Sequence, residues 1–199
     1  MWYWLANAIY IPWTVWAVTW IIAAAWANRT VTGAGVSRQA PYRLFTTAGF
    51  ALLLIGFIGR SQPPAWMSLL FQRHWEFPAG VQWAMVGLAT LGFLFCWWAR
   101  LHLGALWSGR ITRKEGHHVV NTGPYRLVRH PIYTGILLAA LATMLLKGTT
   151  ASIMGFAFLI IGYTMKAKLE ERFLREELGA ADYDEYARRT PMIVPLSPV

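Results

Sequence analysis

The sequence predicts an all-α, polytopic membrane protein with about five transmembrane helices. Three observations support this fold class: 56% of the 199 residues are apolar, long uncharged stretches recur, and most charged residues fall between them. Residues 1–100 are expected to hold the N-terminal transmembrane helices. Residues 101–199 are expected to hold a polar loop, a tight hairpin formed by the last two helices, and a cytosolic amphipathic C-terminal helix region. We interpret residues 1–199 as one domain.

The first three apolar stretches approach the roughly 20 helical residues that a hydrocarbon layer requires. The first runs from about Leu5 to Ala27, with tryptophans spread along it, several of which must lie deeper than the membrane interface. No basic flank or convincing cleavage site marks it as a removable signal, so we expect it to be retained. The second runs from about Leu44 to Gly59 and the third from about Val81 to Trp98. The chain beyond Arg100 is too polar to span, although its first part can extend the third helix.

Two shorter apolar segments follow the polar loop and predict the helical hairpin. They run from about Ile132 to Leu146 and from Ala151 to Met165, with only four residues between them. Each arm is about 23 Å long at 1.5 Å per residue, so it crosses a thinned membrane or enters it part-way. Both alternatives return the chain to the side from which it entered.

The tail is amphipathic rather than apolar. Its large apolar residues follow a helical spacing; they are Leu169, Phe173, Leu174 and Leu178. Gly179, which comes next, is a plausible C-cap of this helix. A second short helix is expected to begin near Asp182, an N-cap type of residue, and to stop before Pro191.

The distribution of basic residues predicts the orientation. If the N-terminus lies outside, 15 of the 18 Lys and Arg residues fall on the inner side and 3 on the outer side. We therefore expect a multi-pass protein of the cytoplasmic (inner) membrane, with the polar loop and the C-terminus facing the cytosol. The net charge of +9 is explained by this bias and by membrane lipids with anionic headgroups, and nucleic acid is not an expected partner.

Several classes of function are disfavoured by the motifs that the chain lacks. A metal site is not predicted, because the adjacent His117 and His118 are unlike a ligand pair and no HExxH motif or set of cysteines completes them. The lone Cys96 is interpreted as a buried small residue. No GxSxG elbow indicates a hydrolase, and the spans carry essentially none of the ionisable groups of a proton-coupled transporter.

One stretch, from His117 to Gly135, combines basic, aromatic and turn-forming residues directly before an apolar helix. It is either a loop that fixes membrane orientation or a functional site. Lys166 and Glu170, spaced i,i+4, share one helix face at the exit of the hairpin. The two side chains either form an ion pair that stabilises the helix surface or bind a zwitterionic ligand, and both alternatives remain open at this point.

These segments carry a resemblance to a known family. HHVVNTGPYRLVRHPIYTG, the hairpin, and the tail EERFLREELGAADYDEYARRTPMIVP occur in that order. Together they resemble the integral-membrane isoprenylcysteine carboxyl methyltransferase family and its prokaryotic relatives, which are also similar to phospholipid methyltransferases. The resemblance covers about the C-terminal half of the chain, from near Leu103 to Pro195. The N-terminal spans match only as generic hydrophobic helices.

The resemblance implies an S-adenosyl-L-methionine-dependent methyltransferase with a cytosol-facing cofactor pocket, the product S-adenosyl-L-homocysteine, and a lipophilic methyl acceptor that arrives from the bilayer. It implies catalytic roles for Lys166 and Glu170, with Lys166 also binding the acceptor. The cofactor-binding positions that it implies are His117, His118, Val119, Val120, Tyr125, His130, Pro131, Ile132, Tyr133 and Glu170.

Two positions depart from the eukaryotic pattern of that family. Lys166 stands where an arginine is associated with the acceptor carboxylate, which keeps the charge but loses the bidentate fork. Arg110 aligns with a glutamine that approaches the cofactor, so that contact is not carried over. The expected reaction is a direct displacement, by analogy carboxyl O-methylation. An amine acceptor would need a base, for which Glu170, Glu171 or a histidine is available.

Two other readings stay open. One is a phospholipid or small-amine N-methyltransferase, which the identity of the acceptor would distinguish. The other is a non-catalytic membrane scaffold, which cofactor binding would distinguish. The oligomeric state is not predicted.

Overall fold

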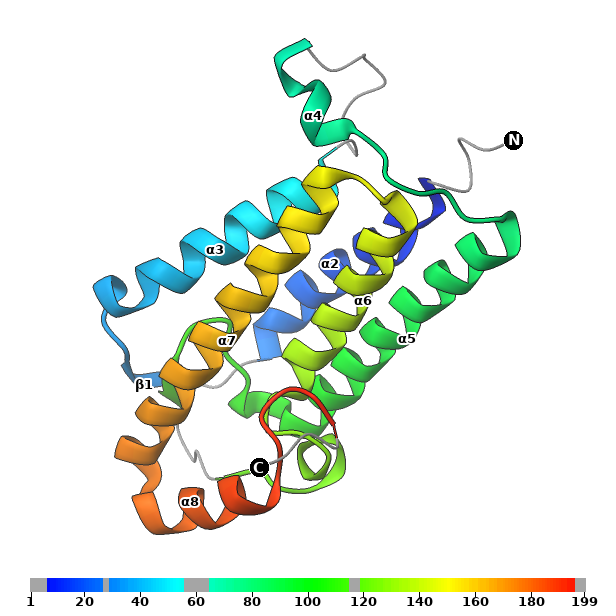
Figure 1. Ribbon diagram of the computed structural model, residues 1–199. Coiled ribbons are helices and arrows are strands. Elements are labelled where there is room, and N and C mark those ends of the chain that lie inside the picture. The colour runs from blue at the N-terminus through cyan, green and yellow to red at the C-terminus, as the bar shows by residue number, and fades with distance from the viewer. Residues whose placement is uncertain (1–6, 27–28, 56–64, 115–118, 196–199) are drawn as a thin grey trace.

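The computed structural model describes residues 7–26, 29–55, 65–114 and 119–195. Its long helices lie side by side as a slanted bundle (Figure 1). They are α2 (Tyr10–Ala23), α3 (Val36–Leu54), α5 (Ala79–Leu103), α6 (Pro131–Lys147) and α7 (Thr150–Leu178). Helix α3 packs along α7, α5 packs along α6, and α2 contacts α5.

Shorter elements lie at the two ends of the bundle (Figure 1). They are η1 (Ala24–Trp26), β1 (Thr30–Gly33), η2 (Ala65–Met67), α4 (Ser68–Phe71), η3 (Gly104–Leu106), β2 (Thr112–Lys114), η4 (Gly123–Arg126) and α8 (Ala180–Arg189). The two strands pair antiparallel, an element that the sequence did not predict in this helical chain.

The helical fold class is confirmed. Two helical segments, Ala79–Leu106 and Thr150–Glu177, are long and apolar enough to cross a membrane, and Tyr10–Trp26 and Pro131–Lys147 are shorter apolar helices. As predicted, the third helix continues past Arg100, and it ends at Leu103. The buried Cys96 also agrees with the sequence interpretation.

The second helix begins earlier than predicted. We expected it from Leu44, but α3 begins at Val36 and carries Pro41 in its interior. Arg38 and Arg43 made this part look like a loop, yet a helix can extend beyond its apolar part. The expected ends at Leu5, Ala27 and Gly59 lie outside the described residues.

The hairpin is confirmed, but its second arm is much longer than predicted. Gly148 turns the chain in the left-handed region, at φ 60°, and Thr149 then caps α7 by accepting from the backbone N–H of Ser152. Helix α7 does not end near Met165. It runs on to Leu178, so the amphipathic segment is its last part and not a separate tail helix, because no helix-breaking residue separates the apolar pattern from the amphipathic one.

The end of α7 agrees with the sequence prediction, and the start of α8 is close to it. Gly179 follows α7 with φ 105°, a conformation that favours glycine, and is thus the C-cap that we expected. Helix α8 begins at Ala180 rather than near Asp182, and it ends at Arg189, before Pro191.

Helices α5 and α6 approach closely at a pair of glycines. A Cβ atom on Gly92 would lie 2.5 Å from the carbonyl oxygen of Gly135, so a larger residue would push the helices apart. One turn further, the Cys96 thiol donates a hydrogen bond to the carbonyl oxygen of Ile132 at 3.3 Å. This contact fixes the start of α6, where the functional segment ends, against α5.

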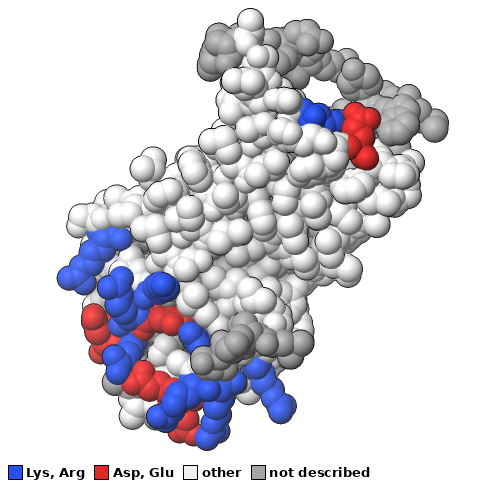
Figure 2. All heavy atoms as spheres, in the orientation of Figure 1, with Lys and Arg blue, Asp and Glu red and all other residues white. Residues whose placement is uncertain are grey.

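The charged residues gather at one end of the bundle, around α8 and the C-terminal part of α7, and a band of uncharged residues separates them from a small charged group at the other end (Figure 2). Contacts between distant segments explain this arrangement. Strand β1, from the first loop, pairs with β2, from the long polar loop, and Thr32 donates a hydrogen bond to Glu177 of α7. The three segments assigned to the inner side therefore meet at one end.

Candidate functional site

A cavity of about 200 Å³ opens at the charged end of the bundle. Its walls come from α2, the segment after α5, the segment before α6, the first turns of α6, the second half of α7, and α8. The site is therefore assembled from parts of the chain that are far apart in sequence, and it depends on the packing of the whole bundle.

The residues singled out from the sequence come together in this cavity. Those that line it are Val119, Val120, Tyr125, His130, Pro131, Ile132, Tyr133, Lys166 and Glu170. His117 and His118 lie outside the described residues. Arg110 also lines the cavity, which places it beside the predicted positions.

The segment before α6 is held by the C-terminal tail. Pro131 occupies the first position of α6, where its missing N–H is not needed. The backbone N–H groups of Arg129 and His130 donate to the carbonyl oxygens of Pro191 and Met192, at 2.8 and 3.0 Å. The C-terminal tail thus fixes the backbone of His130 directly before the start of α6.

Glu171 is a site-forming residue to which the sequence interpretation gave no specific place. Its carboxylate accepts hydrogen bonds from Arg129, through Nε at 2.8 Å and Nη2 at 3.2 Å. It also lies 3.0 Å from His130 Nε2. A carboxylate that contacts Nε2 favours the ring tautomer that carries its proton there. In the sequence, Glu171 stood out as part of the EE pair of the tail and as one of several candidate bases.

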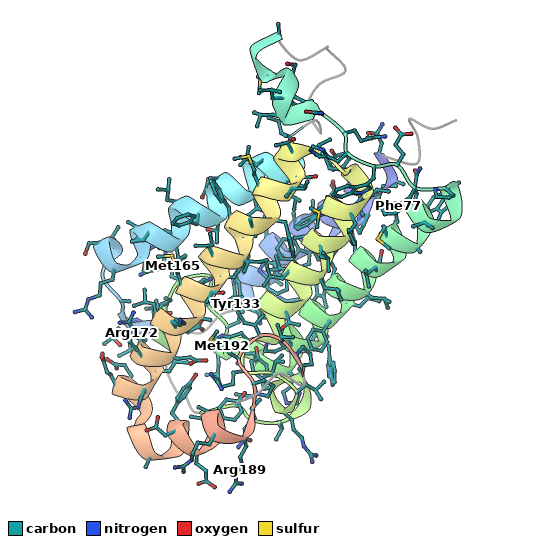
Figure 3. All side chains as sticks on the ribbon, viewed as in Figure 1. Phe77, Tyr133, Met165, Arg172, Arg189 and Met192 are labelled. Atoms are coloured by element: carbon teal, nitrogen blue, oxygen red, sulfur yellow. The ribbon has the colours of Figure 1, made fainter. Side chains whose placement is uncertain are left out.

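His130 and Tyr133 form a parallel stacked pair in the first turn of α6. Their ring centroids are 5.1 Å apart and the ring planes differ by 2°. Tyr133 donates its hydroxyl proton to Glu170 Oε2, and its ring lies 5.0 Å from the ammonium of Lys166. Figure 3 shows Tyr133 between α6 and α7, on the same side as Met192.

Lys166 and Glu170 are both partly buried in the cavity wall, so the interpretation as a surface pair does not describe them. The Lys166 ammonium donates to the carbonyl oxygen of Gly109 at 3.2 Å and lies over the Tyr42 ring as well as the Tyr133 ring. Both charged groups therefore contact Tyr133. They place one positive and one negative charge in the same cavity wall.

Tyr125 joins the cavity to α8. Its side chain is buried, and its backbone carbonyl oxygen accepts a hydrogen bond from the Tyr186 hydroxyl at 2.6 Å. Burial raises the pKa of the Tyr125, Tyr183 and Tyr186 hydroxyls well above the ordinary value of tyrosine. These three groups thus stay neutral at physiological pH and provide hydrogen-bond donors and ring faces.

The other end of the cavity is aromatic and was not predicted. Trp16 and Trp20 of α2 line it together with Trp107. The Trp16 and Trp20 centroids are 5.2 Å apart, and the Trp20 and Trp107 centroids are 5.5 Å apart. We refer to these three residues as the aromatic end. In the sequence, Trp16 and Trp20 were only part of a run of tryptophans along the first apolar stretch, and their common face with Trp107 forms only when α2 packs against α5.

Two buried polar atoms of the cavity walls have no hydrogen-bond partner among the described residues. They are the indole Nε1 of Trp16 and the hydroxyl of Thr112. A buried polar group without a partner is costly, and each of these atoms exposes less than 1 Å² of surface.

The described residues form a helical bundle, with two helices long and apolar enough to cross a membrane, around an internal site of mixed polar and aromatic character. The sequence profile of the isoprenylcysteine carboxyl methyltransferase family matches residues 85–176, which contain most of the site. The chain belongs to this family.

Three relatives illustrate the range of the similarity. A cobalt-zinc-cadmium resistance protein of Cupriavidus metallidurans is 31% identical over 165 residues, 74% of this chain and 70% of that protein. Protein-S-isoprenylcysteine O-methyltransferase B of Arabidopsis thaliana is 33% identical over 87 residues, 43% of this chain and 44% of that protein. Methanethiol S-methyltransferase 2 of Bradyrhizobium diazoefficiens is 33% identical over 132 residues, 61% of this chain and 49% of that protein. The match thus spans less than half of either named methyltransferase.

Proposed function

We propose that this protein transfers a methyl group from S-adenosyl-L-methionine to a lipophilic acceptor at the membrane. One observation carries this proposal: the described residues that the family pattern assigns to the cofactor and the acceptor all line a single cavity. The names of two relatives, an isoprenylcysteine O-methyltransferase and a methanethiol S-methyltransferase, support the reaction class.

The residues present fit this cofactor. Its amino acid head needs groups of both charges, and Lys166 and Glu170 supply them from one wall. Its adenine needs a ring face, which Tyr125 in the cavity wall offers. The pair of His130 and Tyr133 adds a stacked polar wall.

When bound, the cofactor supplies a methyl group on a sulfonium; the bond from this carbon to the acceptor forms as the carbon–sulfur bond breaks, and its electron pair stays on sulfur. The role of the chain is to exclude water and to align the two partners, which can supply much of the acceleration. Glu170 and Lys166 orient the cofactor, and the apolar walls desolvate the acceptor heteroatom. Lys166 also provides positive charge for an anionic acceptor group.

We further propose that residues 1–199 form one multi-pass unit of the cytoplasmic membrane, with the cavity and the C-terminus on the cytosolic side. The gathering of basic residues at the cavity end supports this orientation (Figure 2). It gives the cofactor access from the cytosol and the acceptor access from the bilayer.

The proposal is tested by calorimetric titration of the detergent-purified protein with S-adenosyl-L-homocysteine. We expect saturable binding that Glu170→Ala abolishes or greatly weakens, because Glu170 is the charged partner of Tyr133 in the cavity. Glu176→Ala is the matched control, since Glu176 lies on the same helix but is exposed and outside the cavity. A well-folded protein that binds nothing, in lipid as in detergent, would refute the proposal and favour a scaffold.

A further inference from the structure

We infer that Arg100 is a positioning residue of the cofactor cavity, which joins the C-terminal ends of α2 and α5 and thereby holds residues 106–110 in the arrangement that binds the cofactor. We refer to residues 106–110, all of which line the cavity, as the wall segment. This inference rests on the proposed function and adds to it a residue that does not itself line the cavity. Three observations support it: a buried cation without a carboxylate partner, its bonds to two helix ends, and the path of the chain from these bonds to Lys166.

Arg100 is the largest fully buried side chain of the described residues, with 1% of its surface exposed. It forms no ion pair with a carboxylate of those residues. A buried charge is costly unless it is paired and hydrogen-bonded, and an apolar residue of similar length could fill the same space at a lower cost. Filling the interior therefore does not explain an arginine at this position, so the explanation lies in its hydrogen bonds.

The guanidinium of Arg100 binds the ends of two helices that form the cavity. Nη2 donates to the carbonyl oxygen of Ala23, the last residue of α2, at 2.7 Å, and Nη1 donates to that of Gly104, the residue after α5. The carbonyl end of a helix attracts a cation, so both bonds are favourable. The charge also lies over two indole rings, 4.7 Å from the centroid of Trp107 and 5.8 Å from that of Trp26. Nε has no hydrogen-bond partner among the described residues, so the two terminal nitrogens alone make the hydrogen bonds.

The chain leads from Gly104 directly to the wall segment. Gly104 has φ 58°, a conformation that favours glycine, and its carbonyl oxygen also accepts from the backbone N–H of Trp107 at 3.4 Å. One oxygen atom therefore binds both Arg100 and the wall segment. At the other end of the segment, the carbonyl oxygen of Gly109 accepts from the ammonium of Lys166 at 3.2 Å. Without Arg100 we expect the start of the wall segment to shift, and with it the contact that orients the Lys166 ammonium.

The test is calorimetric titration with S-adenosyl-L-homocysteine of Arg100→Met, which keeps an unbranched side chain and removes both bonds. We expect Kd to rise about 10-fold at unchanged stoichiometry, the factor for a wall segment that holds its binding arrangement about a tenth of the time. Arg100→Lys should also bind more weakly than the wild type, because an ammonium cannot reproduce the planar fork that binds two carbonyl oxygens. Arg172→Met is the matched control, since Arg172 is exposed on α7 and does not line the cavity.

A second variant shifts the carbonyl oxygen of Gly104 and leaves Arg100 in place. A Cβ atom at Gly104 has nothing within 4 Å, so Gly104→Ala acts through the positive φ. We expect it to raise Kd as well, and to add little in combination with Arg100→Met, because both variants break the same contact. Gly87→Ala, which also meets nothing within 4 Å but lies inside α5, is the control. Hydrogen exchange should become faster in the wall segment of Arg100→Met but not in the hairpin of α6 and α7.

The two proposals fail in different ways. A wild-type Kd in Arg100→Met or Arg100→Lys, or no effect of Gly104→Ala, overturns the positioning role and leaves the methyltransferase intact. Faster hydrogen exchange across the whole bundle in both Arg100 variants indicates a general role in folding and overturns the positioning role as well. Wild-type protein that does not bind S-adenosyl-L-homocysteine overturns both proposals.

Discussion

Replacing Glu171 tests whether the cavity is organised by its paired carboxylate. In Glu171→Ala, Arg129 loses two hydrogen-bonded contacts and His130 loses one, so two basic groups lose the carboxylate that they share, although Arg129 keeps its bonds to the carbonyl oxygens of Ala187 and Thr190. The Arg129 and Glu171 side chains are 12% and 18% exposed. Breaking a fully buried pair costs about 3–5 kcal/mol and an exposed pair about 0–1 kcal/mol. We therefore expect a loss of about 2–3 kcal/mol in the free energy of unfolding.

The assay is chemical unfolding in mixed micelles, with affinity for S-adenosyl-L-homocysteine as a second readout. Affinity should fall with stability, because His130 lines the cavity and Glu171 orients its ring. A double-mutant cycle with Arg129→Ala should give an interaction energy of about 1–3 kcal/mol. Glu176→Ala, on the exposed face of the same helix, is the control. Wild-type stability and affinity in Glu171→Ala, or no coupling to Arg129, would refute this account of the site.

Two further predictions concern the packing that positions the site. Gly135→Ala places a Cβ atom 2.5 Å from Cys96 Sγ, so we expect a loss of about 1–3 kcal/mol and weaker binding of S-adenosyl-L-homocysteine, whereas Gly87→Ala, where nothing lies within 4 Å, should not destabilise. Thr149→Ala removes the N-cap of α7, which should cost about 1 kcal/mol in unfolding experiments but leave the affinity unchanged, because the cap lies at the end of α7 opposite the cavity. Equal stability of the two glycine variants, or weakened binding in Thr149→Ala, would contradict these expectations.

The parts of the fold that were predictable depend on local patterns. The hairpin around Gly148 follows from two apolar runs and a short polar break, and the common end of the loops follows from counting basic residues. The length of α7 did not follow, because an apolar pattern and an amphipathic pattern meet near Met165 without a helix-breaking residue. The pairing of β1 with β2 joins segments about 80 residues apart, which no local pattern reveals.

The candidate site was predictable only where a family pattern marked it. His130, Tyr133 and Glu170 were implied by the resemblance to the family, and all three line the cavity. Trp16 was not assigned to the site and Glu171 was named only as one of several candidate bases, because each acquires its place through a partner far away in the sequence. For Trp16 this partner is Phe93, and for Glu171 it is Arg129.

The two successive carboxylates of α7 explain why the stacked rings of α6 hold one arrangement. Neighbouring residues on a helix point about 100° apart, so Glu170 and Glu171 reach different targets. Glu170 accepts the Tyr133 hydroxyl, and Glu171 contacts His130 Nε2, while the two rings stack against each other. Because His130 is also tied to the tail through Met192, a shift of α7 along its axis would break contacts at both rings. The continuity of α7 past Met165 is therefore a condition for the site, since a break there would free both carboxylates from the register that α3 and α6 impose on the helix.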